Sequence, residues 1–241
     1  QVGSALAAIE RLKAKQPTSP VPDQLRGIAL LQNGDVAAAR LAFEAAQRAD
    51  ANYFAATAKL VELGVAAGKL EEARRRAEES IKLAPKNTAA RMTLVSVLVR
   101  LGVPPVEVRS VLDEAIRLAP NEIAPRLVLM ALLRDTGDVK GALATAQAAI
   151  TAIPDQPDIL EAVAQAQLAA GEEQQAVSTL NKLASLRPGS PVAFVRLADL
   201  YARRSDRQSA MTNLRRAAEV APESADVFDR LVGHAVKTRD V

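Results

Sequence analysis

The side chains in this sequence that could do chemistry are one histidine, several acidic pairs and several arginine clusters. His234 is the only histidine and the chain contains no cysteine, so the usual ligands of a zinc site are missing. Glu71–Glu72 and Glu172–Glu173 stand where helices are expected to begin, and carboxylates there are favoured by the helix dipole. The sequence also holds no Gly-rich phosphate loop and no HExxH or GxSxG segment. We therefore predict that the protein is not an enzyme and has no catalytic residue, metal or cofactor.

Arginine is the residue type best suited here to an anionic partner. Arg74–Arg76 has glutamates three or four residues away, which is the spacing of ion pairs on a solvated helix face. The clusters Arg203, Arg204, Arg207 and Arg215–Arg216 have fewer acidic neighbours, so an anionic partner remains open for them. The net charge is only +3, and two tyrosines and four phenylalanines offer little for base stacking. We therefore predict no nucleic-acid partner.

These residues are placed by an internal repeat of 34 or 35 residues. Its first mark is a series of glycines, with a serine at the sixth position: Gly34, Gly68, Gly102, Gly137, Gly171 and Ser205. Its second mark is a series of prolines: Pro85, Pro120, Pro154, Pro188 and Pro222. Each glycine follows an apolar stretch, at a point where a helix end needs a left-handed φ, and each proline closes a second helix. The pattern therefore predicts an all-α chain of helix pairs.

The second helix of each pair carries a small residue followed by apolar or small residues four and seven positions later, which is one helix face. The small residues are Ala39, Ala73, Ala142, Ala176 and Ala210. In the third repeat Val108 takes this place, and the segment 102–106 holds one extra residue and two prolines. We expect a longer turn there.

This repeat resembles the tetratricopeptide repeat (TPR) family, and the sixth repeat matches its first-helix pattern best, with Phe194, Leu197, Ala198 and Tyr201. The resemblance implies a right-handed solenoid (αα superhelix) of antiparallel helix pairs that binds a protein partner in a concave groove lined by the first helices. The expected units are 20–53, 54–87, 88–122, 123–156, 157–190 and 191–224, in a single solenoid over 1–241.

Two further helices flank these units. Residues 3–17 read as a lone second helix with Ala5, Ile9 and Leu12 on its buried stripe, and 225–238 as a lone first helix with Phe228 and Leu231. Because both ends fall within a repeat and the chain does not begin with Met, we expect a fragment of a longer array. Such ends could also associate with each other. No signal peptide and no apolar run long enough to span a membrane are present.

Helical phase predicts which first-helix residues face the groove. The predicted partner-binding residues are Lys59, Glu62, Met92, Ser96, Arg100, Leu127, Ala131, Arg134, Glu161, Gln165, Arg196, Asp199 and Arg203. The same phase places Gln24, Ile28 and Leu31 there in the first unit. An apolar floor with a basic rim suits a peptide with an acidic group. The alternative is that Met92 and Leu127 pack on neighbouring helices and the arginines are solvated.

The groove lacks one familiar TPR feature. Chaperone-binding members resemble one another in a carboxylate clamp of Lys and Asn, and those positions hold Gln24, Leu25, Ile28, Ala89 and Thr93. Capture of a chaperone C-terminus is therefore not expected. The scarcity of aromatic residues argues against sugar stacking, but the sequence leaves open whether the ligand is a protein, a peptide or a polysaccharide, and it does not identify the partner.

Four phrases are more specific: GDVAAARLAFE (34–44), PRLVL (125–129), AQLAAGEEQQA (166–176) and LRRA (214–217). Together they resemble the TPR-repeat putative lipoprotein of the bacterial PEP-CTERM/exosortase system. That resemblance implies an exported protein, in the periplasm or at the outer membrane, that serves exopolysaccharide export and protein sorting. The alternatives are a subunit of cellulose, alginate or Pel polysaccharide secretion, or a recruiting or regulatory arm of a larger enzyme. The residues themselves are equally compatible with the cytoplasm.

Overall fold

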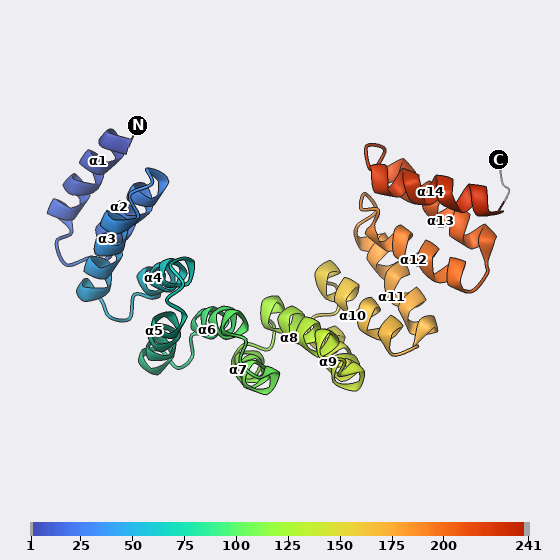
Figure 1. Cartoon of the computed structure of the whole chain (residues 1–241), viewed down its shortest axis with the longest axis horizontal. Coiled ribbons are helices and arrows are strands. Elements are labelled where there is room, and N and C mark those ends of the chain that lie inside the picture. Colours follow the sequence, from blue (N-terminus) through green and yellow to red (C-terminus); the bar gives the residue numbers. More distant parts are fainter. Residues whose placement is uncertain (1, 239–241) are drawn as a thin grey trace. The chain divides into compact units, whose positions relative to one another are not determined.

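The computed structural model describes residues 2–238, and every regular element in that range is an α-helix. The helices are α1 (Val2–Lys15), α2 (Val21–Gln32), α3 (Val36–Ala49), α4 (Phe54–Ala66), α5 (Leu70–Leu83), α6 (Thr88–Leu101), α7 (Pro105–Leu118), α8 (Ile123–Asp135), α9 (Val139–Ala152), α10 (Pro157–Ala169), α11 (Glu173–Leu186), α12 (Val192–Arg203), α13 (Arg207–Val220) and α14 (Ala225–Thr238). From α2 to α13 they form successive pairs joined by short turns (Figure 1). The predicted all-α class is confirmed.

The chain divides into two compact units, Gln1–Ala119 with α1–α7 and Pro120–Val241 with α8–α14. Each unit is described by itself. Within them, the even-numbered helices α2–α12 are the first helices of the pairs, and the odd-numbered helices α3–α13 are the second helices.

The turn inside each pair has the backbone that the glycine series predicts. All five glycines have a positive φ, between 67° and 81°. Ser205 has φ 61° and is the only other residue in the described range with a left-handed backbone. The left-handed φ expected of the series is therefore confirmed, and it extends to the serine.

A Ser205→Gly variant is expected to be more stable than the wild type. A side chain in the left-handed region costs about 1 kcal/mol, and glycine removes that cost. We expect unfolding in urea, followed by far-UV circular dichroism, to show a gain of about 0.5–1 kcal/mol. The reverse change Gly171→Ser should lose a similar amount, and a gain in both variants would contradict this explanation.

The turn of the third repeat corrects one expectation. It comprises 102–104, and is as long as the turns 67–69 and 136–138, not longer. Helix α6 continues to the residue before Gly102, and α7 then begins directly at Pro105. Proline fits the first helical position because its missing N–H would have no partner there. The extra residue of this repeat lies in α6, which is one residue longer than α4 or α8. The turn therefore stays three residues long.

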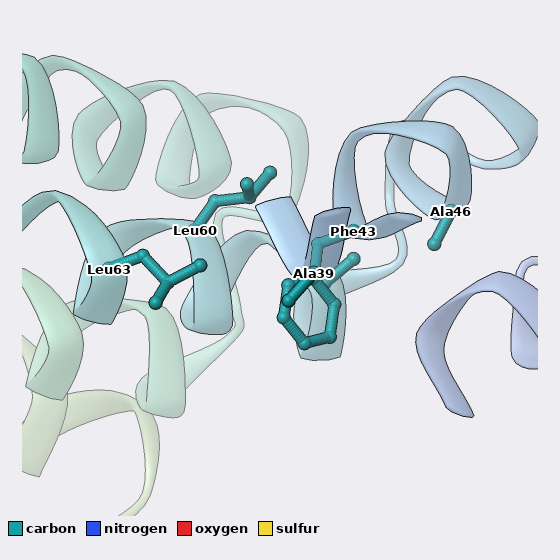
Figure 2. Close-up of a cluster of buried hydrophobic side chains, with 6 residues drawn as sticks. Ala39, Phe43, Ala46, Leu60 and Leu63 are labelled. Atoms are coloured by element: carbon teal, nitrogen blue, oxygen red, sulfur yellow. The ribbon is translucent and has the colours of Figure 1, made fainter. Parts of the chain in front are cut away.

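The core of each unit lies between its helix pairs. In the first unit, Phe43 of α3 lies beside Ala39, with Leu60 and Leu63 of α4 on one side (Figure 2). In the second unit the corresponding layer is formed by Leu160, Ala164, Leu180, Leu183, Ala193 and Leu197. The predicted face of the second helices is buried in every pair, including Val108. Small residues on this face let the helices approach closely.

The two flanking helices differ from the prediction in their buried faces. In α1, Ala5 is exposed while Ile9 and Leu12 are half-buried. In α14, Val227 is buried, whereas Phe228 is 41% exposed and Leu231 is half-buried. In the preceding repeat, Phe194 and Leu197 are the residues at the positions of Phe228 and Leu231, and both are buried. Helix α14 packs mainly on α13, and Val227 is buried like Ala193 at the same position of the preceding repeat, so only part of the face that is buried in α12 is covered in α14.

Candidate partner-binding surfaces

The thirteen predicted groove residues are all at least partly accessible to solvent. Five of them belong to α4 and α6 of the first unit, and eight belong to α8, α10 and α12 of the second. In the first unit α4 contacts α6, and in the second α8 contacts α10, so first helices of neighbouring repeats lie side by side. Outside these thirteen, Gln24 was also predicted to face the groove, but it is buried and donates its amide to the carbonyl of Ala55 at 3.5 Å. Ile28 and Leu31, predicted with it, are half-buried against the core cluster around Phe43.

The first unit has an open groove of about 510 Å³ between α4 and α6, which we call the α4–α6 groove. Its lining residues are Ala58, Val61, Glu62, Val65, Ala66, Thr93, Ser96, Val97 and Arg100. Three predicted residues, Glu62, Ser96 and Arg100, are among them. The valines of its floor, Val61, Val65 and Val97, were not among the predicted residues.

The two cations near the rim of this groove, Lys59 and Arg100, differ in whether they already have a partner. The Nζ of Lys59 lies 2.7 Å from the Oε2 of Glu62, so that carboxylate already has a partner. Arg100 is exposed and forms no ion pair with any described residue. Met92, which was predicted for the floor, is half-buried and lies outside the lining.

The second unit carries two adjoining pockets that share Arg134, Gln165 and Ala169, and together we call them the α8–α12 groove. The smaller is apolar, with a volume of about 80 Å³, and is lined by Leu127, Met130, Ala131, Val139, Ala142, Ala162 and Ala166 besides the shared residues. The larger, about 630 Å³, adds Leu168, Arg196, Asp199 and Arg203. Of the eight residues predicted in this unit, only Glu161 is not part of the lining.

A chain of polar contacts crosses this groove from helix to helix. Arg134 of α8 donates from Nη1 to the Oε1 of Gln165 at 3.0 Å. The Nε2 of Gln165 donates to the Oε1 of Glu161 at 3.4 Å, and Arg196 of α12 donates from Nη2 to the same oxygen at 3.4 Å. These contacts fix the side chains before any partner arrives, which reduces the ordering cost of binding.

Asp199 is neutralised from outside the groove. The Nη1 of Arg230 on α14 lies 3.1 Å from both of its carboxylate oxygens. The pKa of the Arg230 guanidinium is raised, first by its hydrogen bond to Asp226 and then by the charge of Asp199. Arg203 is exposed and has no ion pair among the described residues. The groove therefore keeps an excess of positive charge.

Two arginines that the sequence prediction gave no role are structural. Arg91 and Arg126 stand at the same place in consecutive first helices, and both are buried. Arg126 donates from Nε and Nη2 to the carbonyl of Pro120 at 3.1 and 2.8 Å, and Arg91 makes the corresponding contact to Pro85. Burial lowers the pKa of Arg126. Their 35-residue spacing was the available signal for this shared role.

The remaining candidates for chemistry lie apart from these grooves. His234 is half-buried, and its Nε2 lies 3.2 Å from the carbonyl of Arg207. Within residues 2–238, no three His, Cys, Asp or Glu side chains are placed to hold a metal ion together. No helix in that range is both long and apolar enough to cross a membrane.

Comparison with known proteins places this arrangement in a family. The family model described as tetratricopeptide repeat matches residues 59–123 and 131–191, which is more than half of the chain. A search of curated protein sequences found no significant match.

Solved structures show the same fold. The C-terminal part of a TPR repeat-containing protein from Cytophaga hutchinsonii superposes with a TM-score of 0.71 at 14% identity, over 95% of this chain and 94% of that chain. YrrB, described as a TPR protein with an unusual peptide-binding site, gives 0.58 at 17% identity, over 83% and 98%. The Cut9–Hcn1 hetero-tetramer of the APC/C gives 0.60 at 15% identity, and this chain spans 97% of its own length but only 46% of that chain.

Proposed function

Because this chain belongs to the tetratricopeptide repeat family, we propose that it is a non-catalytic scaffold that holds a protein or peptide partner on the exposed side of its first helices. The TPR fold itself suggests a protein–protein interaction scaffold. The observation that carries the proposal is that the first and the second helices have different roles. Second helices bury their small residues, whereas the polar residues of first helices line open grooves that already have fixed side chains.

The pathway is the finer part of the proposal. The four phrases at 34–44, 125–129, 166–176 and 214–217 favour a role in bacterial exopolysaccharide export or PEP-CTERM protein sorting, in the periplasm or at the outer membrane. This part rests on the sequence resemblance alone. The alternative is a recruiting or regulatory arm of a larger enzyme, or of a cellulose, alginate or Pel secretion subunit, whose chemistry would lie outside this segment.

Site-specific photocrosslinking tests both parts. A photoreactive amino acid is placed at Ser96 in the α4–α6 groove or at Ala169 in the α8–α12 groove. Matched controls carry it at Leu41 of α3 and Ser178 of α11, which are exposed on second helices. With an envelope fraction of the source cell, we expect adducts from the groove positions and none from the controls, and mass spectrometry of the adduct identifies the pathway.

Three outcomes would count against the proposal. Adducts from Leu41 or Ser178 alone would move the site to the second helices. An adduct between two copies through α14 would favour end-to-end self-association, because Phe228, Val232 and Val236 are exposed there. A partner that is an enzyme subunit encoded beside this chain, rather than an export component, would favour the recruiting arm.

A further inference from the structure

We propose that the α8–α12 groove binds an extended acidic segment of a partner protein through its Asp or Glu side chains, with Arg203 as the principal contact. The inference rests on the proposed function, because it names the ligand class of one of the same surfaces. It commits to side-chain carboxylates and not to a chain terminus.

The first argument is the balance of charge in the groove. Each of its acidic neighbours is already matched by a cation of the same unit. Asp199 is held by Arg230 at 3.1 Å, Glu161 by Arg196 at 3.4 Å, and Asp135 by Arg134 at 2.9 Å. Arg203 has no such partner in the described part of the chain and lies in the wide, solvent-open pocket. The surplus positive charge is therefore concentrated at Arg203.

The second argument is hydrogen-bonding capacity. The Nε of Arg196 is buried and has no acceptor in the protein, although its Nη2 contacts Glu161. Arg203 presents an entire guanidinium, whose planar donors match a carboxylate with two parallel bonds. The buried Nε of Arg196 is closed to a ligand, whereas Arg203 is exposed in the wide pocket. Acceptors supplied by a ligand would therefore satisfy donors of Arg203 that the fold leaves unused.

The third argument is the shape of the ligand that fits. The cations stand on two helices, Arg134 on α8 and Arg196 and Arg203 on α12, with Leu168 and Ala169 of α10 between them. Arg134 and Arg196 are already paired, but each guanidinium has five N–H donors and keeps some beyond those contacts, so donors spread in this way suit several polar side chains along a segment, with Arg203 holding the carboxylate. The adjoining pocket around Leu127 and Ala131 is apolar and small, so it suits a small apolar side chain beside the acidic ones.

The same lining disfavours nucleic acid. None of the residues that line the two pockets is aromatic. Single-stranded nucleic acids bind through stacking on aromatic rings in addition to contacts with cations. An acidic peptide needs only contacts with the cations to bind.

The test measures fluorescence anisotropy of a short fluorescein-labelled peptide in which Glu alternates with Ala. The peptide is acetylated and amidated, so its only carboxylates are side chains, and a second peptide has Gln in place of Glu. The full chain is compared with Arg203→Glu and with Arg215→Glu. Arg215 is an exposed arginine of α13 outside both pockets, so the two variants change the net charge equally.

We expect the wild type to bind the Glu peptide, more weakly as salt is raised, and not the Gln peptide. Arg203→Glu should lose about tenfold in affinity or more, whereas Arg215→Glu should stay within about twofold because screening limits distant charges. Circular dichroism confirms that each variant is folded, and Arg203→Gln replaces Arg203→Glu if the latter is not.

Several results would overturn the inference. Equal losses in Arg203→Glu and Arg215→Glu would show a non-specific charge effect, and equal binding of the Gln peptide would show that carboxylates are irrelevant. Binding of an oligonucleotide but not of the peptide, lost in Arg203→Glu, would point to nucleic acid. Failure of the Glu peptide while Ala169 still crosslinks to a protein would sink this inference alone, since the proposed function would stand. Failure of both experiments would sink the two together.

Discussion

Replacing Phe43 by alanine is expected to cost about 3–5 kcal/mol of unfolding free energy, the usual loss for a fully buried phenylalanine. Phe43 has no exposed surface and lies in the layer formed by α3 and α4 (Figure 2). It also fills the space left by Gly27 on α2, because a Cβ at that glycine would collide with the ring. The Phe43 side chain therefore packs against both α2 of its own pair and α4 of the next repeat. Urea unfolding followed by far-UV circular dichroism measures the loss.

Phe228→Ala provides the matched control. Phe228 stands on α14 and is 41% exposed, so truncation should cost less than about 1 kcal/mol. Similar losses in the two variants would contradict the assignment of the Phe43 layer as the core of the first unit.

Arg126→Ala is expected to cost about 2–3 kcal/mol, because it removes a buried side-chain stem and leaves a cavity between helices. Arg126 is only 5% exposed and donates two hydrogen bonds to the carbonyl of Pro120. Urea unfolding followed by far-UV circular dichroism measures the loss. We expect the lower stability in the unfolding transition of the second unit.

Arg126→Leu separates packing from hydrogen bonding. Leucine is the natural residue at this place in the next repeat, where Leu160 is 1% exposed. Because Pro120 is exposed, its carbonyl can bind water instead, and an apolar replacement for a buried ion is often neutral. We expect the Leu variant to lie within about 1 kcal/mol of the wild type. A loss as large as that of Arg126→Ala would assign the stabilisation to the bonds with Pro120.

Local signals predicted much of the fold. Positive φ at Gly34 or Gly171 follows from the chemistry of a single residue, and the buried face of the second helices follows from spacing along one helix. The short turn at 102–104 was missed although its residues were noticed, because the extra residue extends α6 to the position before Gly102 and does not lengthen the turn.

Helical phase limited the prediction of the groove. First helices carry apolar residues on several faces, since they contact both their own second helix and neighbouring first helices. One residue turns a helix by about 100°. That ambiguity is why Gln24 was placed in the groove although it is buried, and why Val61, which lines the α4–α6 groove, was not predicted there.

The sequence by itself determined the repeat, the helix pairs and the family resemblance, because each depends on residues within one period of the chain. Only the tertiary structure decided which charges remain available. Arg230 reaches Asp199 across 31 positions and Arg196 reaches Glu161 across 35, whereas Arg203 has no such partner among the described residues. Ion pairing falls steeply with the distance between side chains, and those distances are set by how the helices of successive repeats pack.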